Sequence, residues 1–142
     1  MVVRTAERIV RKIDACRETY DRLLALVPRL AAGETDAVTW AATERFLQIV
    51  LECMIDVGEM VIAWKSLGHA EENRDVFLLL GRRGVLDEAL ARRLVRAAGL
   101  RNLLVHQYEA IDRERLKRTL SEDLKDFSEF ARQVTEFARR PG

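Results

Sequence analysis

Proline, glycine and long apolar runs are scarce in this chain of 142 residues. It has only two prolines and seven glycines, whereas alanine, leucine, arginine and glutamate are plentiful, a composition that favours helices. No apolar run approaches the ~20 residues of a membrane-spanning helix, so we expect no contact with a membrane. Residues 1–4 begin a charged helix rather than a signal peptide, and we expect a cytoplasmic protein.

The chain also has only two cysteines and almost no net charge. Cys16 and Cys53 form no metal-ligand pattern, and we expect both to be reduced residues at apolar positions of separate helices. The formal net charge of +1 excludes the global basic field that marks many nucleic-acid-binding proteins. With 49% hydrophobic and 33% charged residues, the composition indicates a globular protein with one domain, residues 1–142.

Charge is nevertheless distributed unevenly along the chain. Residues 34–60 contain six acidic residues and one arginine, whereas residues 81–101 contain six arginines and two acidic residues. Two interpretations stay open. The acidic and basic segments either face each other across the fold, or the surplus arginines contact the phosphates of a nucleic acid.

Hydrophobic residues at steps of three and four predict an all-α, up-and-down bundle of four long helices and one short helix. We expect them at about residues 5–27, 37–66 and 74–82, then from a cap at Asp87 into the segment 101–108, and from a cap at Asp112 onward. Pro28 and Gly33 are expected to end the first helix, and Thr35 or Asp36 to cap the second.

The second expected helix is apolar on two sides. One apolar line contains Phe46, Val50, Met54, Val57, Val61 and Trp64, and the other contains Leu47, Leu51, Ile55, Gly58 and Ile62. A helix this apolar usually buries two faces. One face must pack on its own bundle, and the other is a candidate homodimer interface. The alternative is that the bundle covers both faces.

A short segment of the fourth expected helix concentrates chemically active side chains. It contains Arg101, Asn102, His106 and Tyr108, and His106 is one of only two histidines in the chain. Arginine is always cationic and can bind a phosphate through two parallel hydrogen bonds, and histidine exchanges protons near neutral pH. Arg101 and His106 could therefore hold and cleave a phosphodiester.

The spacing of these residues limits how they can cooperate. At about 100° per residue, Asn102 and His106 are nearly aligned, whereas Arg101 and His106 are roughly 140° apart on an ideal helix. A straight helix would not direct both at one phosphate. Either the helix is distorted near Gly99, or the long arginine side chain reaches around it, or a second copy of the chain supplies half of the site.

Glu52 and Asp56 lie four residues apart on the polar strip of the second helix. We expect them to support the site by holding its arginine or histidine, with a solvated face as the alternative. A metal site would need a histidine nearby, and His69 falls in a loop beyond the helix, so we expect no metal and no other cofactor. The structural alternative is that Arg101 only pairs with Glu52 or Asp56 and that His106 is a buried histidine.

RNA can be cleaved without a metal ion because its own 2′-hydroxyl attacks the adjacent phosphorus. The reaction needs a base, an acid and a cation that stabilises the charge on the phosphorane. Arg101 fits the cation, His106 fits the base or the acid, and Asn102 could orient the phosphate or the imidazole. One histidine can serve as the base or as the acid, so a second group is needed for the other proton transfer. A two-fold dimer that brings two copies of the motif into one cleft would supply a second histidine.

The pattern of Arg101, Asn102, His106 and Tyr108 resembles the signature of HepT toxins, small helical proteins of the HEPN superfamily. Residues 52–58 are similar to the second helix of that family, and residues 74–80 and 84–87 look like its middle segment. The resemblance therefore extends over about residues 40–115.

The resemblance implies a metal-independent endoribonuclease toxin that acts as a homodimer, with Arg101 and His106 of both copies lining a cleft and Asn102 in support. It also implies a partner, an MntA-like nucleotidyltransferase antitoxin, which attaches AMP to Tyr108 and blocks RNA by charge and bulk. A rival interpretation is a non-catalytic HEPN module that binds a nucleotide or the nucleotidyltransferase. A third is a helical dimer without a ligand.

Overall fold

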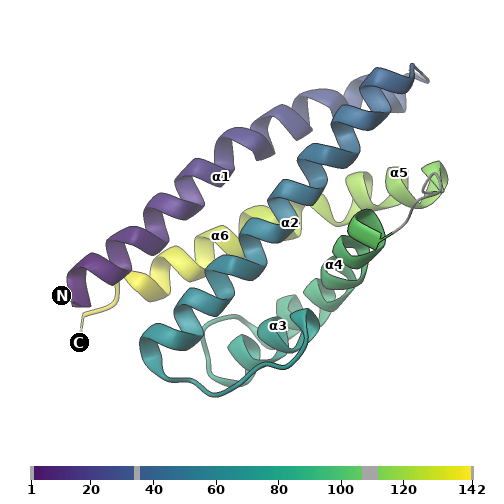
Figure 1. The fold of residues 1–142 in the computed structure, drawn as a ribbon. Coiled ribbons are helices and arrows are strands. Elements are labelled where there is room, and N and C mark those ends of the chain that lie inside the picture. The colour runs from purple at the N-terminus through teal and green to yellow at the C-terminus, as the bar shows by residue number, and fades with distance from the viewer. Residues whose placement is uncertain (1, 34–35, 107–111, 142) are drawn as a thin grey trace.

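The computed structural model describes residues 2–33, 36–106 and 112–141, and in these ranges the chain is all-α, with six helices and no strand. The helices are α1 (Val2–Ala31), α2 (Ala37–Lys65), α3 (Asn73–Arg82), α4 (Glu88–His106), α5 (Arg113–Glu122) and α6 (Leu124–Ala138). The start of α1 and the end of α6 meet at one end of the bundle (Figure 1). Within the described ranges, no helix combines the length and the apolar character needed to span a membrane.

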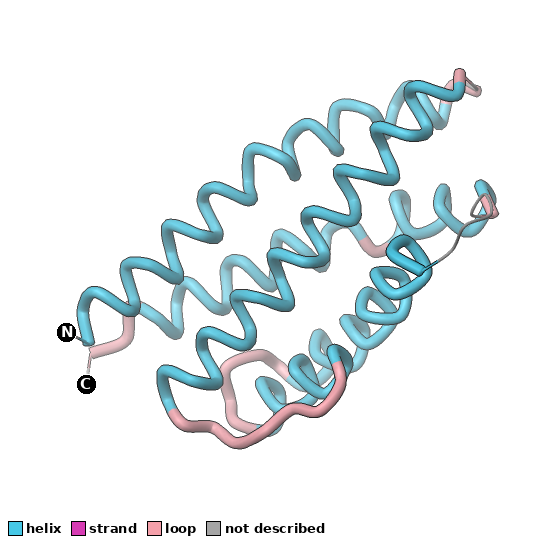
Figure 2. The backbone as a smooth tube through the Cα atoms, in the orientation of Figure 1, coloured by secondary structure: helices cyan, strands magenta, loops and turns pink. Residues whose placement is uncertain are grey.

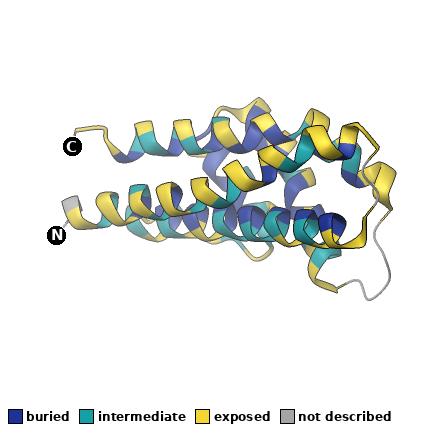
Figure 3. Cartoon of the chain, turned by 90° about the horizontal axis from the view of Figure 1, so that it is seen from above, coloured by how far each residue is buried: buried dark blue, intermediate teal, exposed yellow. Residues whose placement is uncertain are grey.

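α2 lies at the centre of the bundle and contacts α1, α3, α4 and α6. Buried positions line the inner sides of the helices (Figure 3), and they include members of both apolar lines of α2. The buried members of the two lines are Leu47, Val50, Leu51, Met54, Ile55, Val57, Gly58, Val61 and Ile62. The apolar character of α2 is thus explained within one chain, because its neighbours cover both faces. The candidate dimer interface on α2 is therefore mostly covered within one chain, with Phe46 and Trp64 half-buried.

α1 continues past Pro28, where the sequence predicted its end. Proline removes only the hydrogen bond to the carbonyl of Leu24, four residues earlier, and Leu24 lies on an exposed side where water can satisfy that carbonyl. Leu30 continues the apolar stripe and is buried, which stabilises the additional turn. Gly33 follows the helix with a φ of +93°, the left-handed conformation that favours glycine.

The last expected helix is two helices, α5 and α6, which meet at Asp123. The apolar stripe continues through Leu120 and Leu124 across this junction, which is why its period predicted a single helix. Contacts from other helices hold the junction. Arg96 of α4 pairs with Asp123 at 2.9 Å, and the hydroxyl of Tyr20 donates a hydrogen bond to the carbonyl of Leu124 at 3.0 Å. The expected four long helices and one short helix are thus six helices in the described residues.

Aspartate side chains cap three helices, as predicted. Asp36 accepts hydrogen bonds from the backbone N–H groups of Val38 and Thr39 at 2.9 and 3.3 Å. Asp87 and Asp112 each accept one from the backbone N–H two residues further on, at 3.0 Å. The hydroxyl of Thr39, followed by the N–H of Val38, holds the pKa of Asp36 below its ordinary value.

α3 approaches α2 closely at Gly58. A Cβ atom at this position would lie 2.5 Å from Cγ1 of Val76 and 3.2 Å from Cδ1 of Leu80, so the approach requires glycine. α3 also packs on α4, and the loops on either side of α3 lie at the same edge of the bundle (Figure 2). Through α3, α2 supports the part of α4 that leads to the motif.

Candidate functional site

The motif lies on the last two turns of α4, which the structure describes as far as His106. The helix continues through Gly99 and Arg101, so the distortion considered from the sequence is not observed in the described part of α4. Arg101 is partly buried, whereas Asn102 and His106 are exposed. Tyr108, the expected modification site, lies outside the described residues.

The guanidinium of Arg101 lies between α4 and α2. Its Nη2 atom is 3.6 Å from Oε1 of Glu52, and its Nη1 atom donates a hydrogen bond to the side-chain oxygen of Asn102 at 3.4 Å. The Arg101 side chain is 26% exposed and that of Glu52 is 36% exposed, so water reaches the pair only in part. A pair this exposed contributes about 1 kcal/mol or less to stability.

Glu52 has a second contact, with Gln48, that was not predicted from the sequence. The side-chain amide of Gln48 donates a hydrogen bond to Oε1 of Glu52 at 3.2 Å, one helical turn away. The spacing of four residues on the polar strip of α2 is the signal that could have identified it. Gln48 and Arg101 thus contact the same carboxylate oxygen, and this limits the positions that Glu52 can take.

One nitrogen of Arg101 has no partner in the described part of the chain. Nε is buried and makes no hydrogen bond with any described residue. A buried donor left unpaired costs about 1–3 kcal/mol, so packing alone does not favour this arrangement. Because the contact with Glu52 is long, at 3.6 Å, the guanidinium is held in place but can still bind an oxyanion.

His106 is exposed at the end of the described part of α4 and is not a buried histidine. Since α4 is an ordinary helix here, His106 lies roughly 140° around the helix from Arg101. The imidazole is open to a ligand, whereas the guanidinium is directed toward α2. Within one chain, therefore, the two side chains do not converge on one phosphate.

Asp56 lies beside another partner. Its Oδ2 atom is 3.6 Å from the Nζ atom of Lys12, on α1. Glu52 and Asp56 share a polar strip, but one carboxylate faces α4 and the other faces α1. We expected both residues to support the motif. In this structure Glu52 contacts Arg101, whereas Asp56 pairs with Lys12 on α1.

Two arginines of α4 pair with aspartates at the start of α6, and a third, Arg101, pairs with Glu52 of α2. Nε of Arg93 donates to both carboxylate oxygens of Asp126 at 3.1 and 3.3 Å, and Arg96 pairs with Asp123. Asp126 is buried, so Arg93 compensates a charge that would otherwise be costly. One interpretation of the uneven charge was that the acidic and basic segments face each other across the fold. Between α2 and α4, Glu52 and Arg101 do so.

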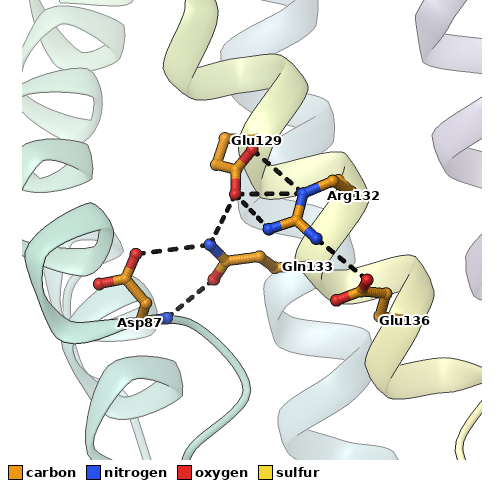
Figure 4. A network of polar contacts seen from close by, with 5 residues as sticks. All are labelled: Asp87, Glu129, Arg132, Gln133 and Glu136. Carbon is orange, nitrogen blue, oxygen red and sulfur yellow. Dashed lines mark hydrogen bonds and ion pairs between the residues drawn. The ribbon is translucent and has the colours of Figure 1, made fainter.

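A polar network fastens the start of α4 to α6 (Figure 4). The backbone N–H of Asp87 donates to the side-chain oxygen of Gln133 at 2.8 Å, and the amide of Gln133 donates to Glu129 at 3.0 Å. Arg132 pairs with Glu129 and Glu136 on the same helix. The hydrogen bonds from Arg132 and Gln133 lower the pKa of Glu129 to about 2. The network therefore fixes the end of α4 opposite the motif.

The two cysteines are partly buried and carry free thiols, and they lie on facing sides of α1 and α2. Together with Tyr20 and Phe127 they line an apolar cavity of about 50 Å³. The interaction between the two neighbouring thiols lowers the pKa of Cys16 and raises that of Cys53, and burial raises the pKa of Cys53 further. Within the described ranges, no three histidine, cysteine, aspartate or glutamate side chains gather closely enough to share a metal ion.

Comparison with known proteins gives one family and several relatives. The family model described as "Ribonuclease HepT-like" matches residues 16–134. A protein named "tRNA nuclease HepT" from Aphanizomenon flos-aquae is 30% identical over 95 residues, which are 67% of this chain and 65% of that protein. An "mRNA nuclease HepT" from Shewanella oneidensis is 30% identical over 84 residues, 59% of this chain and 63% of that protein. The chain thus matches slightly less than two thirds of the length of either relative.

Solved structures agree with the helical arrangement. A crystal structure of a toxin–antitoxin with AMP-PNP contains a chain with a TM-score of 0.82 and 23% identity, and the match covers 90% of this chain and 97% of that one. A tri-AMPylated Shewanella oneidensis HEPN toxin in complex with MNT antitoxin has a TM-score of 0.81 and 23% identity, covering 90% and 96%. At this identity the comparison establishes the fold.

Proposed function

The chain belongs to the HepT-like ribonuclease family, whose model covers residues 16–134, and from this membership we propose that it is an endoribonuclease toxin that acts without a metal ion. The observation that carries the proposal is the state of Arg101. Its guanidinium is held by Glu52 and Asn102, its buried Nε has no hydrogen-bond partner among the described residues, and an exposed His106 lies five residues further on. The side chain of Arg101 is 26% exposed, so a phosphate can bind the guanidinium through its exposed part.

The proposed reaction uses the RNA's own nucleophile. An imidazole of His106 takes the proton of the 2′-hydroxyl, and the 2′-oxygen attacks the adjacent phosphorus. Arg101 binds the non-bridging oxygens and stabilises the negative charge of the phosphorane. A second imidazole, in its protonated form, gives a proton to the leaving 5′-oxygen. The products are a 2′,3′-cyclic phosphate and a 5′-hydroxyl end.

We further propose that the second imidazole comes from a second copy of the chain. One chain offers one histidine in the motif, and its Arg101 and His106 face different sides of α4. The surface that would meet the second copy is the outer face of α4, formed by Val95, Gly99, Asn102, Leu103 and His106. A Cβ atom at Gly99 would have no atom within 4 Å, so nothing in the described part of the chain requires a glycine there. Close approach of a second helix would require it.

The proposal includes control by a nucleotidyltransferase antitoxin of the MntA type that attaches AMP to Tyr108. Support comes from the Shewanella oneidensis relative, which was solved as a tri-AMPylated toxin with its MNT antitoxin. Tyr108 is two residues after His106 in the sequence. Phosphate groups added there would compete with the RNA backbone for Arg101. The expected result of incubation with ATP and the cognate antitoxin is a gain of AMP mass that Tyr108→Phe abolishes.

A second candidate function is a non-catalytic module that binds a nucleotide or the antitoxin. The pairing of Arg101 with Glu52 favours it, because a neutralised arginine can serve a structural role. Purified protein and RNA distinguish the two candidates. If the protein is the proposed nuclease, cleavage should leave 2′,3′-cyclic phosphate ends. A chelator should not reduce the cleavage rate, and His106→Ala should abolish cleavage. His69→Ala is the matched control, because His69 is also exposed but lies in the loop between α2 and α3. RNA binding without cleavage in the unmodified protein would support the module.

A further inference from the structure

A groove of about 510 Å³ lies at the end of the bundle where α1 begins and α6 ends. We call it the terminal groove; α1 contributes Glu7 and Arg11, α2 contributes Trp64 and Lys65, and Arg139 and Arg140 follow α6. Figure 1 places this end of the molecule opposite the motif end of α4. Along α2, Lys65 is 13 residues from Glu52, or about 20 Å at the helical rise.

The described residues that line the terminal groove carry an excess of positive charge. Four of their side chains are cationic, Arg11, Lys65, Arg139 and Arg140, and one, Glu7, is a carboxylate. None of the four forms an ion pair with any residue that the structure describes. In contrast, the arginines of α4 that line the cavity beside α5 and α6 pair with aspartates. The groove is therefore suited to a ligand with several negative charges.

An aromatic ring lies among these cations. Trp64 is partly buried, meets Phe137 edge to face at 6.1 Å, and has the Nζ atom of Lys65 4.2 Å from the centroid of its ring. Arg140 lies over the ring of Phe137 at 5.4 Å. A cationic groove lined by an aromatic ring is an arrangement with which proteins bind single-stranded nucleic acid, since the cations contact phosphates and the ring stacks on a base. Lys65 would have to move from the face of Trp64 to let a base stack there.

We propose that the terminal groove is a second binding site for single-stranded RNA, which holds part of the substrate away from the cleavage site. This inference rests on the proposed ribonuclease function. It predicts that the protein selects RNA molecules long enough to reach both the motif and the terminal groove. A dinucleotide can occupy the cleavage site alone, so its cleavage does not depend on the groove.

The helix ends offer a structural explanation for some of these cations. Lys65, Arg139 and Arg140 lie at the C-terminal ends of α2 and α6, where positive charge interacts favourably with the helix dipole. Arg11 lies within α1 and is not explained in this way. If stabilising the helix ends were the role of these cations, replacing them would lower the melting temperature and leave the affinity for RNA unchanged.

Binding is measured by fluorescence anisotropy with a labelled single-stranded RNA, on the full chain carrying His106→Ala so that the RNA stays intact. In this background, the pair Arg11→Gln and Arg139→Gln is expected to raise Kd about tenfold or more at physiological salt. The slope of log Kd against log salt should fall by about 0.7 for each phosphate that the variant no longer neutralises. Trp64→Leu is expected to raise Kd without changing that slope. Lys125→Gln is the matched control, because Lys125 is exposed on α6 and far from the groove.

An unchanged Kd in the double variant, with folding intact by circular dichroism, would overturn the proposal. The result is independent of the nuclease assignment. If the parent chain binds RNA but does not cleave it, the groove variants still report on the groove. If the parent chain cleaves RNA and the groove variants change neither Kd nor the KM for long RNA, the groove proposal fails and the nuclease assignment stands.

Discussion

The Arg101 guanidinium lies 3.6 Å from the carboxylate of Glu52, which joins the motif helix α4 to the central helix α2. The contact has two opposing consequences for a phosphate ligand. It holds the guanidinium in position, and it also places a competing negative charge beside it. A substitution that removes the charge and keeps the shape of Glu52 should therefore change binding and catalysis in opposite directions.

Glu52→Gln is expected to lower the KM for RNA by up to about fivefold, because a partly exposed ion pair contributes about 1 kcal/mol or less and RNA no longer competes with it. It should also lower kcat, because the guanidinium loses its anchor and spends less time in the reactive geometry. Steady-state kinetics on a labelled RNA measure both constants. Asp56→Asn is the matched control, since Asp56 lies one turn away and pairs with Lys12. Equal changes in the two variants would contradict the positioning role.

Gly58→Ala is expected to destabilise the protein by about 1–3 kcal/mol, the usual cost of overpacking. The new methyl group would lie 2.5 Å from Val76, and α3 would have to move away from α2. Gly99→Ala, unfolded at a protein concentration that keeps the chain monomeric, provides the contrast, because its Cβ atom meets nothing within 4 Å of the single chain and alanine is the better helix former by about 1 kcal/mol. Urea unfolding measures both. Similar destabilisation by the two substitutions would be inconsistent with this packing.

The low pKa of Glu129 makes the network that anchors α4 sensitive to acid. The hydrogen bonds from Arg132 and Gln133 lower this pKa to about 2, from an unfolded value of about 4.3. A carboxylate with a depressed pKa stabilises the folded state above its unfolded pKa, and this contribution is lost as the pH falls through the folded pKa. The melting temperature of the wild type at pH 7 should therefore be higher than that of Glu129→Gln. The difference between the two melting temperatures should shrink as the pH falls from about 4.5 to 2. A difference that stays constant over this range would contradict the assignment.

Gly99→Gln is expected to weaken the proposed dimer. The side chain has room in the single chain, but it would separate two copies that approach along the outer face of α4. The dimer dissociation constant, measured by analytical ultracentrifugation, should rise about tenfold or more, the equivalent of about 1.4 kcal/mol. Ala89→Gln, at an exposed position near the start of α4, should leave it unchanged. A Gly99→Gln variant that dimerises as well as wild type would move the interface elsewhere.

Local signals predicted the fold well, and long-range contacts account for the differences. The caps at Asp36, Asp87 and Asp112 were predictable because each aspartate bonds to a backbone group only two residues away. The break at Asp123 was not, because it depends on Arg96, 27 residues earlier. The predicted end of α1 at Pro28 was wrong. The proline removes one backbone hydrogen bond, and the free energy gained by burying Leu30 outweighs that loss.

The candidate site follows the same division. The charge of Glu52 and its place on the polar strip predicted a partner for Arg101, and the structure places the two side chains together. The same reasoning could not distinguish Asp56, because Lys12 comes from a helix that the local pattern does not relate to α2. The terminal groove was also invisible from the sequence, since three segments far apart in the chain form it.

In the proposed dimer, one cleavage site needs His106 from both copies of the chain. Two copies joined by a flexible linker, one wild type and one carrying His106→Ala, should be assayed for RNA cleavage beside the linked wild-type pair. Loss of a general acid or base costs about 10²–10⁴ in rate, so the mixed pair should be at least about 100-fold slower than the wild-type pair. A mixed pair that keeps half of the wild-type activity would show that each chain cleaves RNA alone, and would contradict the shared site.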